Sequence, residues 1–167
     1  MDVNLLAKLV PVPSGARRTE FNWTQVEAEI GVLLPTSYKD VCRVFGAGTF
    51  FKFINVFDPW TPNRHMNLCV QWGIRRKALI ESGWPTPLYV FPPVGGLLTV
   101  GSTDNGDFLC METGGSEVVW LGEARGPSWE RFEMDLCEFL VRCVEGRLDS
   151  ELVQLELPSP TFDSAVS

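Results

Sequence analysis

Histidine is almost missing from this chain of 167 residues, which contains His65 and no other. Because imidazole is the usual base near neutral pH, any relay between a nucleophile and a histidine would have to use this one side chain. His65 follows a proline, an asparagine and an arginine in a polar stretch, and no nucleophile motif lies beside it. We therefore predict no catalytic residues and expect that the protein is not an enzyme.

Motifs for metals, cofactors and phosphates are also lacking. The cysteines are odd in number and none are two or three positions apart, which disfavours a zinc site and a disulfide framework; they are Cys42, Cys69, Cys110, Cys137 and Cys143. Gly46-Ala47-Gly48 has no third glycine and precedes a strand pattern, so it is not a dinucleotide-binding loop. The acidic residues from 104 to 112 do not have the spacing of a calcium loop. We expect no cofactor and no metal.

Long apolar runs are absent, since no stretch approaches the roughly 20 apolar residues that span a membrane. Residues 1–11 have neither the basic start nor the small-residue cleavage site of a secretory signal. We therefore expect a cytoplasmic protein that does not bind membranes. Hydrophobic residues make up 45% and charged residues 21% of the chain, which is typical of a folded globular domain.

Basic residues are scarce in the last third of the chain. Residues 101–167 hold 14 acidic and 4 basic residues, whereas residues 41–100 hold 2 acidic and 6 basic ones, within a total net charge of −7. An acidic chain is poorly suited to phosphate backbones, so we expect no direct contact with nucleic acid. The triplet Arg75-Arg76-Lys77 is more typical of a helix surface than of a nucleic-acid-binding patch. The acidic third is either a solvated surface or a surface for a basic protein partner.

Capping residues and apolar spacing predict four helices. They run from Asn22 to Gly31, from Pro35 to Gly46, over 67–82, and from Asp135 to Gly146. Residues 1–20 are predicted to be a lead-in that prolines and a glycine keep from forming a helix, and residues after Ser150 a loose tail.

Strands are predicted from apolar and β-branched runs between turn residues. They cover 49–57, 88–91, 97–102, 107–112, 117–123 and 129–132. Asn105-Gly106 is the strongest hairpin signal, because a type I′ turn needs positive φ at both central positions. Consecutive hairpins with helices before and after them predict an α+β fold. We expect one domain over 21–149, with an antiparallel sheet packed against N-terminal helices and a C-terminal helix, between a lead-in (1–20) and a tail (150–167).

The order of these motifs is distinctive. They are Trp23–Glu27, Leu34-Pro35, Tyr38-Lys39, Gly46 and Gly48 before Phe50, Gly95-Gly96-Leu97-Leu98, Asn105-Gly106-Asp107, Trp120, and Glu138-Phe139-Leu140. Over residues 22–147 this order resembles the SMI1/KNR4 family, also called the SUKH superfamily. The chain departs from the family at Val100 and Met111, where relatives often have tryptophan, and residues 66–84 are hard to align.

The resemblance implies a single α+β domain with no known catalytic activity. Bacterial members look like immunity proteins of polymorphic toxin systems, which neutralise a toxin, often a nuclease, by binding it. Eukaryotic relatives act as regulatory or scaffolding modules. Our leading hypothesis is an immunity protein whose partner is a basic toxin domain, and the alternative is a regulatory module that binds an endogenous protein or peptide.

We expect partner contacts from carboxylates around the hairpin and the last strands, with one aromatic anchor. These residues are Asp104, Asp107, Glu112, Glu117, Glu123 and Trp120. For Trp120 the alternative, a core aromatic residue on a strand, stays open.

Overall fold

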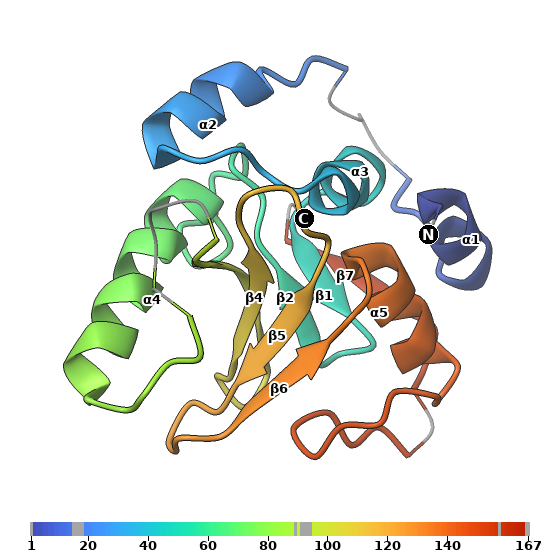
Figure 1. Ribbon diagram of the computed structural model, residues 1–167. Coiled ribbons are helices and arrows are strands. Elements are labelled where there is room, and N and C mark those ends of the chain that lie inside the picture. The colour runs from blue at the N-terminus through green and yellow to red at the C-terminus, as the bar shows by residue number, and fades with distance from the viewer. Residues whose placement is uncertain (1, 15–18, 89, 91–94, 157, 166–167) are drawn as a thin grey trace.

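The computed structural model describes the chain except residues 1, 15–18, 89, 91–94, 157 and 166–167 (Figure 1). Its strands are β1 (Gly48–Phe50), β2 (Ile54–Val56), β3 (Leu97–Thr103), β4 (Phe108–Glu112), β5 (Val119–Gly122), β6 (Trp129–Phe132) and β7 (Phe162–Ser164). They form one antiparallel sheet in the order β6-β5-β4-β3-β2-β1-β7. The first six strands follow one another as a meander, and β7 returns to pair with β1 at the far edge.

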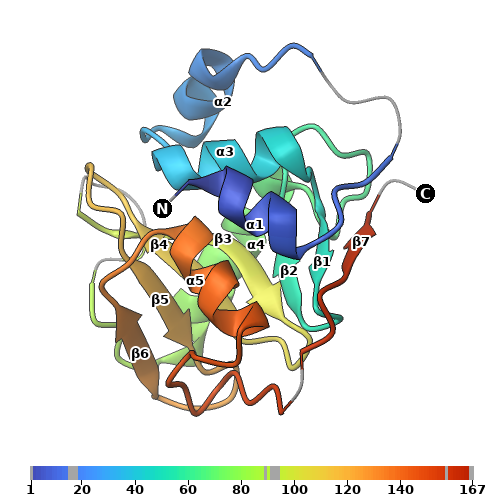
Figure 2. The ribbon, with the colours of Figure 1, turned by 90° about the vertical axis from the view of Figure 1, so that its right-hand side faces the viewer.

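Helices cover both faces of this sheet (Figure 2). They are α1 (Val3–Leu9), α2 (Trp23–Ile30), α3 (Thr36–Val44), α4 (Leu68–Ser82) and α5 (Leu136–Val144). The main core lies between the sheet and the helices α1, α3 and α5, and includes the fully buried Tyr38, Leu109 and Phe139. On the opposite face Leu79 of α4 packs in a second, smaller core with Phe108. The α+β fold is confirmed.

The predicted capping residues begin and end the helices. The side chain of Asn22 accepts a hydrogen bond from the Gln25 N–H at 3.2 Å, and Gly31 ends α2 with φ of +88°. Asp135 accepts from the Glu138 N–H at 2.8 Å at the start of α5. A side-chain oxygen at a helix start satisfies a backbone N–H that has no partner within the helix, so short-range sequence signals fix these boundaries.

One predicted strand is wrong. The stretch 49–57 is a hairpin of β1 and β2, because the Phe53 N–H donates to the Phe50 carbonyl at 2.9 Å and closes a tight turn. Phe51 and Lys52, the central residues of this turn, both have φ of +56°. Positive φ at both positions is the requirement of a type I′ turn, which normally uses asparagine or glycine. The turn was missed because its residues carry no such signal.

Replacing Lys52 with glycine is expected to stabilise the protein by about 1 kcal/mol, because a β-carbon is strained in the left-handed region and glycine is not. Urea unfolding of Lys52→Gly against the wild type measures this gain. The matched control is Lys8→Gly in α1, where the same replacement lies inside a helix and should instead destabilise by about 1 kcal/mol. A loss of stability in Lys52→Gly would contradict the strained turn.

Two elements were not predicted. α1 lies within the expected lead-in, where Asp2 accepts from the Asn4 N–H at 3.0 Å and Leu6 is fully buried. β7 lies within the expected loose tail and pairs with β1 in register. Of the strand predicted over 88–91, residues 89 and 91 lie outside the described residues, and Val90 bridges to Leu97.

Candidate functional site

The six candidate residues lie toward the two ends of β4, which rises about 13 Å between its first and last residue. Near its start are Asp104, Asp107 and Glu123, in the β3–β4 turn and the β5–β6 turn. Near its end are Glu112, Glu117 and Trp120. The structure therefore brings the candidates together as two groups of three rather than as one cluster.

The buried side chain of Asp107 connects the β3–β4 turn and the β5–β6 turn through hydrogen bonds. Its side chain is 5% exposed, and it accepts hydrogen bonds from the Thr103 hydroxyl at 2.7 Å and from the Ala124 N–H at 3.0 Å. A buried carboxylate is costly unless such partners satisfy it. Asp107 is thus engaged in holding the hairpin against the β5–β6 turn, and its side chain does not reach the surface in this conformation.

Asp104 and Glu123 are the carboxylates of this group that reach solvent. Asp104 is exposed at the hairpin turn, where its N–H donates to the Phe53 carbonyl at 2.8 Å. Glu123 is half-buried, and its N–H donates to the Ser128 carbonyl at 2.9 Å across the β5–β6 turn. Backbone hydrogen bonds fix both positions, while the carboxylates remain available for contacts.

Glu117 supplies a cap that α3 lacks. Pro35 precedes α3 and makes no side-chain capping bond. Glu117 instead accepts from the N–H groups of Thr36 at 2.7 Å and Ser37 at 3.3 Å, and from the Ser37 hydroxyl. The Ser37 hydroxyl oxygen also accepts from the Leu136 N–H at 3.2 Å, at the start of α5. One carboxylate therefore joins the positive N-terminal ends of two helices.

Glu112 and Trp120 form a surface cluster with Arg131. The Trp120 indole N–H donates to Glu112 at 2.8 Å, and Ser116 donates to the second carboxylate oxygen at 2.7 Å. The Arg131 guanidinium carbon lies 5.7 Å from the Trp120 ring centroid, and its Nε lies 3.6 Å from Glu112. Trp120 is half-buried. Arg131 was not among the candidates, although it pairs directly with Trp120 between β5 and β6.

The surroundings of Glu112 lower its pKa. Partial burial on its own would raise the pKa, but hydrogen bonds from Ser116 and Trp120 and the positive charge of Arg131 outweigh that effect. The carboxylate is therefore stabilised in its charged form, which keeps the Trp120 indole bonded in place at neutral pH.

Glu112→Gln is expected to lower stability at pH 7 by about 1–2 kcal/mol, because the amide accepts more weakly than the carboxylate. A lowered folded-state pKa contributes stability that is present above the unfolded-state value and is lost as pH falls through the folded-state value. The difference between wild type and variant should therefore shrink as pH falls from about 5 to about 3. Urea unfolding across this range measures it. Glu20→Gln, at an exposed position, is the control, and a pH-independent difference for Glu112→Gln would contradict the account.

The cysteines are packed as apolar residues. Burial raises the pKa of Cys110 and of Cys143 to about 12, so both thiols are protonated at neutral pH. His65 is exposed in its loop. Among the residues that the structure describes, no three histidine, cysteine, aspartate or glutamate side chains gather where a metal ion could be held.

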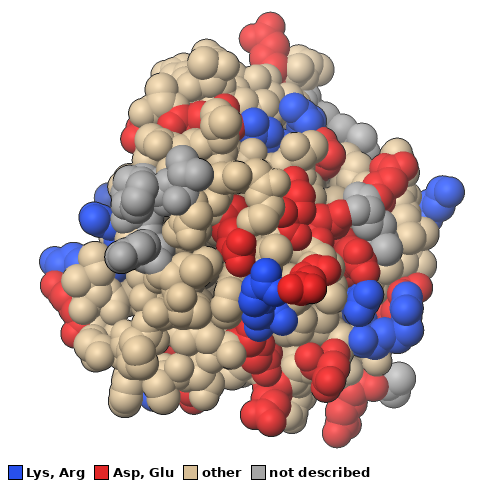
Figure 3. Space-filling view, viewed as in Figure 1, with Lys and Arg blue, Asp and Glu red and all other residues tan. Residues whose placement is uncertain are grey.

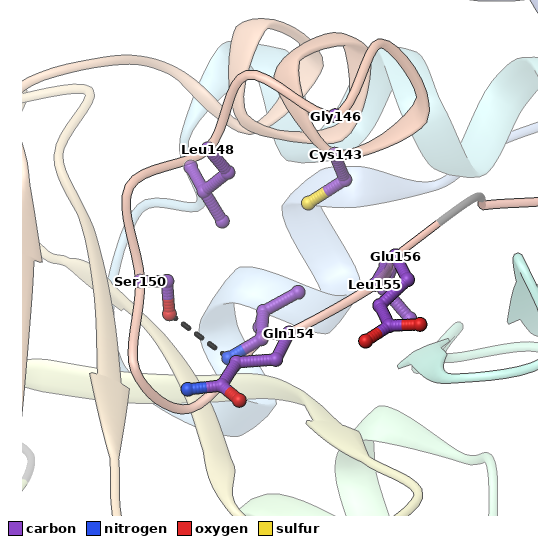
Figure 4. Close-up of a pocket in the computed structure, with 8 residues that line it drawn as sticks. Cys143, Gly146, Leu148, Ser150, Gln154, Leu155 and Glu156 are labelled. Carbon is purple, nitrogen blue, oxygen red and sulfur yellow. Dashed lines mark hydrogen bonds between the residues drawn. The ribbon is translucent and has the colours of Figure 1, made fainter.

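A cavity of about 210 Å³ lies between the end of α5 and the chain that follows it (Figure 4). Cys143, Leu148 and Leu155 contribute to its lining. The Ser150 hydroxyl accepts from the Val153 N–H at 2.9 Å and so closes the loop on one side. Ser150, Gln154 and Glu156 complete the polar part of its lining, beside the protonated thiol of Cys143.

Acidic side chains outnumber basic ones on the part of the surface that carries β5 and β6 (Figure 3). Residues 123–138, which include the edge strand β6 and its flanking turns, hold five acidic and two basic residues. Glu133 follows β6 with 79% of its side chain exposed, and it pairs with Arg131. The carboxylate of Glu130, within β6, instead accepts hydrogen bonds from the Ser150 hydroxyl at 2.5 Å and from the Glu151 N–H at 2.6 Å, so it is engaged by the chain that follows α5.

A seven-stranded antiparallel sheet with helices on both faces and a charged edge defines an α+β domain with an acidic surface. The chain belongs to the SMI1 / KNR4 family (SUKH-1), whose family model matches residues 19–142. No curated protein and no solved structure matches the chain. The match extends into α5, and it includes neither α1 nor β7.

The two departures from the family pattern lie in the core. Val100 and Met111 are both fully buried in the main hydrophobic cluster. The segment that was hard to align, residues 66–84, contains α4, which covers the second face of the sheet. No helix among the described residues has the length and apolar character needed to cross a membrane.

Proposed function

We propose that this protein is a non-catalytic binding module that acts as an immunity protein and neutralises a toxin domain with a basic surface. Membership of the SMI1 / KNR4 family supports a protein-binding role. The observation that carries the proposal is the acidic face, which we define as the carboxylates that reach solvent in the β3–β4 turn and in the turns that flank β6. Its members are Asp104, Glu123 and Glu133.

Charge explains how such a face would engage its partner. Nucleases that bind phosphate are often basic around their active sites, so an acidic surface complements them. Complementary charge accelerates encounter to about 10⁸–10⁹ M⁻¹s⁻¹ at low salt. Asp107 and Glu117 have their carboxylates committed to contacts inside the protein, which leaves Asp104 and Glu123 as the original candidates best placed for contact.

Trp120 is the proposed anchor of this interface. Its ring is half-buried beside Arg131, and its indole N–H is satisfied by Glu112. A large aromatic side chain held in one orientation loses little conformational entropy on binding, which is why tryptophan is enriched among residues that dominate binding energy. Glu112 then acts by positioning Trp120 rather than by meeting the partner.

The direct experiment is coexpression with the protein encoded next to this chain's gene. The proposal expects the two proteins to copurify and the neighbour's toxicity to be suppressed, while the neighbour alone arrests growth. A neighbour that is not toxic, or that is toxic without binding this chain, would contradict the immunity role. Stable copurification with a host protein instead would favour the regulatory alternative.

A further inference from the structure

One arginine of α4 reaches the turn that carries Asp104. Figure 1 shows α4 beside β4, and the Nη1 atom of Arg75 donates to the Gly106 carbonyl in the β3–β4 turn at 3.0 Å. The guanidinium carbon lies 5.9 Å from the ring centroid of Phe57 and 5.6 Å from that of Phe108. A planar guanidinium can donate a hydrogen bond while its face rests on an aromatic ring, so two kinds of contact hold this side chain in place.

Arg75 differs from the two basic residues that follow it. Arg76 and Lys77 are exposed, whereas Arg75 is partly buried. None of the ion pairs among the described residues includes Arg75, and burial lowers the pKa of its guanidinium. Taking a cation out of water without a carboxylate partner costs free energy, so its contacts with the turn and the rings must offset that cost. The basic triplet therefore contains one residue that is engaged by the protein itself.

The β3–β4 turn is held from the sheet as well as from this helix. The Asp104 N–H donates to the Phe53 carbonyl in the β1–β2 turn at 2.8 Å. The Asp107 carboxylate accepts from the Ala124 N–H in the β5–β6 turn at 3.0 Å. Arg75 supplies the contact from α4, at a carbonyl that lies between the two aspartates in the chain. The position of the exposed Asp104 side chain thus depends on how firmly this turn is held.

We propose that Arg75 is a positioning residue of the acidic face, which holds the β3–β4 turn in the conformation that presents Asp104 to the basic partner. This inference rests on the proposed function. Arg75 does not meet the partner itself, because its guanidinium is engaged by the turn and the rings. A turn that already has its bound conformation loses less conformational entropy on binding. A turn that has it for only a fraction of the time lowers the apparent affinity by that fraction.

Charge and positioning predict opposite results for the loss of Arg75. Replacing it with glutamine removes a positive charge beside the β3–β4 turn, which on charge alone would speed association with a basic partner. Loss of the contact with the turn would slow association instead, because fewer molecules would present Asp104 correctly. The direction of the change therefore separates a positioning role from a purely electrostatic one.

The test measures association of the full-length protein with the protein encoded next to its gene, by stopped-flow fluorescence at low salt. Arg75→Gln should associate about fivefold more slowly than the wild type. Arg76→Gln is the matched control, because it removes the same charge from an exposed position of α4 and should associate at least as fast as the wild type. Far-UV circular dichroism and urea unfolding establish that both variants are folded.

A double-mutant cycle shows whether Arg75 acts through Asp104. In protein that carries Asp104→Asn, the further change Arg75→Gln should cause no additional slowing, because the carboxylate that Arg75 positions is already gone. In protein that carries Glu133→Gln, the same change should still slow association by about fivefold. A general loss of folding stability would slow association equally in both backgrounds.

Hydrogen exchange of the free protein tests the contact without a partner. The N–H groups of Asp104 and Gly106 are hydrogen-bonded in the turn, to the carbonyls of Phe53 and Thr103. Both should exchange about tenfold faster in Arg75→Gln than in Arg76→Gln, because the turn opens more often. Equal exchange in the two variants would mean that Arg75 does not hold the turn, and the proposal would be wrong.

Two binding results would also overturn the proposal. The first is association of Arg75→Gln at the rate of Arg76→Gln, which would leave Arg75 without an effect on the partner. The second is slowing that persists in full beside Asp104→Asn, which would mean that Arg75 acts through another residue. Failure of the proposed function looks different, because the wild type itself would then not bind the neighbouring gene's protein, and the positioning role would fall with it.

Discussion

Replacing Glu117 with alanine is expected to destabilise the protein by about 3 kcal/mol, because a cap and charge-assisted hydrogen bonds are lost together. The N–H groups of Thr36 and Ser37 would lose their acceptor at the start of α3. The Ser37 hydroxyl, which also accepts from the Leu136 N–H, would lose the partner that orients it. Urea unfolding at pH 7 measures the change, and the midpoint should fall without a change in slope.

Two variants separate this role from a general effect of removing a carboxylate. Glu117→Gln keeps one acceptor oxygen and should lose only about half as much stability as Glu117→Ala. Glu81→Ala removes an exposed carboxylate from α4 and should change stability by less than about 0.5 kcal/mol. Glu117→Ala with unchanged stability and weakened partner binding would contradict the capping role and return Glu117 to the binding surface.

Reversing the charges of the acidic face is expected to slow association with the neighbouring gene's protein by about a hundredfold at low salt. The variant carries Asp104→Lys, Glu123→Lys and Glu133→Lys, all in the turns that flank β3, β4 and β6. The dissociation rate should change less, because charge steers encounter more than it holds the bound complex. Stopped-flow or surface-based kinetics at two salt concentrations measure both rates.

The control for this variant carries the same number of reversed charges at exposed positions elsewhere: Glu20→Lys, Glu29→Lys and Glu81→Lys. Its net charge equals that of the first variant, so the two differ only in where the charges lie. The account expects the control to associate several times faster than the acidic-face variant. Equal slowing in both would mean that net charge, and not this face, guides the encounter.

The helices and hairpins that were predicted correctly depend on signals a few residues apart. Asn22 and Asp135 each cap a backbone N–H three residues on. The hairpin predicted at Asn105-Gly106 forms, but its turn is not the type I′ turn that was expected. Gly106 adopts φ of +91° whereas the φ of Asn105 is not positive, and the Gly106 N–H closes the turn on the Thr103 carbonyl at 2.9 Å. Such contacts are local, so the residues that make them can be recognised in the sequence before any tertiary structure is known.

The elements and roles that escaped prediction depend on distant partners. Glu117 caps a helix that lies about eighty positions earlier in the chain. Asp107 accepts from a backbone N–H that lies beyond the next two strands. β7 is stabilised by Phe45 and Phe50, far from it in the sequence. Nothing in the spacing of carboxylates tells which ones a fold will use internally, so the candidate site could be predicted only as a region.

The internal hydrogen bonds of some carboxylates narrow the set of candidate contact residues. Asp107 and Glu117 hold turns and helices in place, and Glu112 positions Trp120. Asp104 and Glu123 remain as contact residues, and Arg131 and Glu133 of the edge strand region join them. The binding surface that we propose is thus centred on one end and the outer edge of the sheet.

Hydrogen exchange of this protein, free and bound to the protein encoded next to it, tests the central proposal most directly. The account predicts that binding slows exchange in the β3–β4 turn and in residues 119–134, while α4 exchanges as it does in the free protein. Protection confined to α4 or to α2, with the acidic face unchanged, would contradict it.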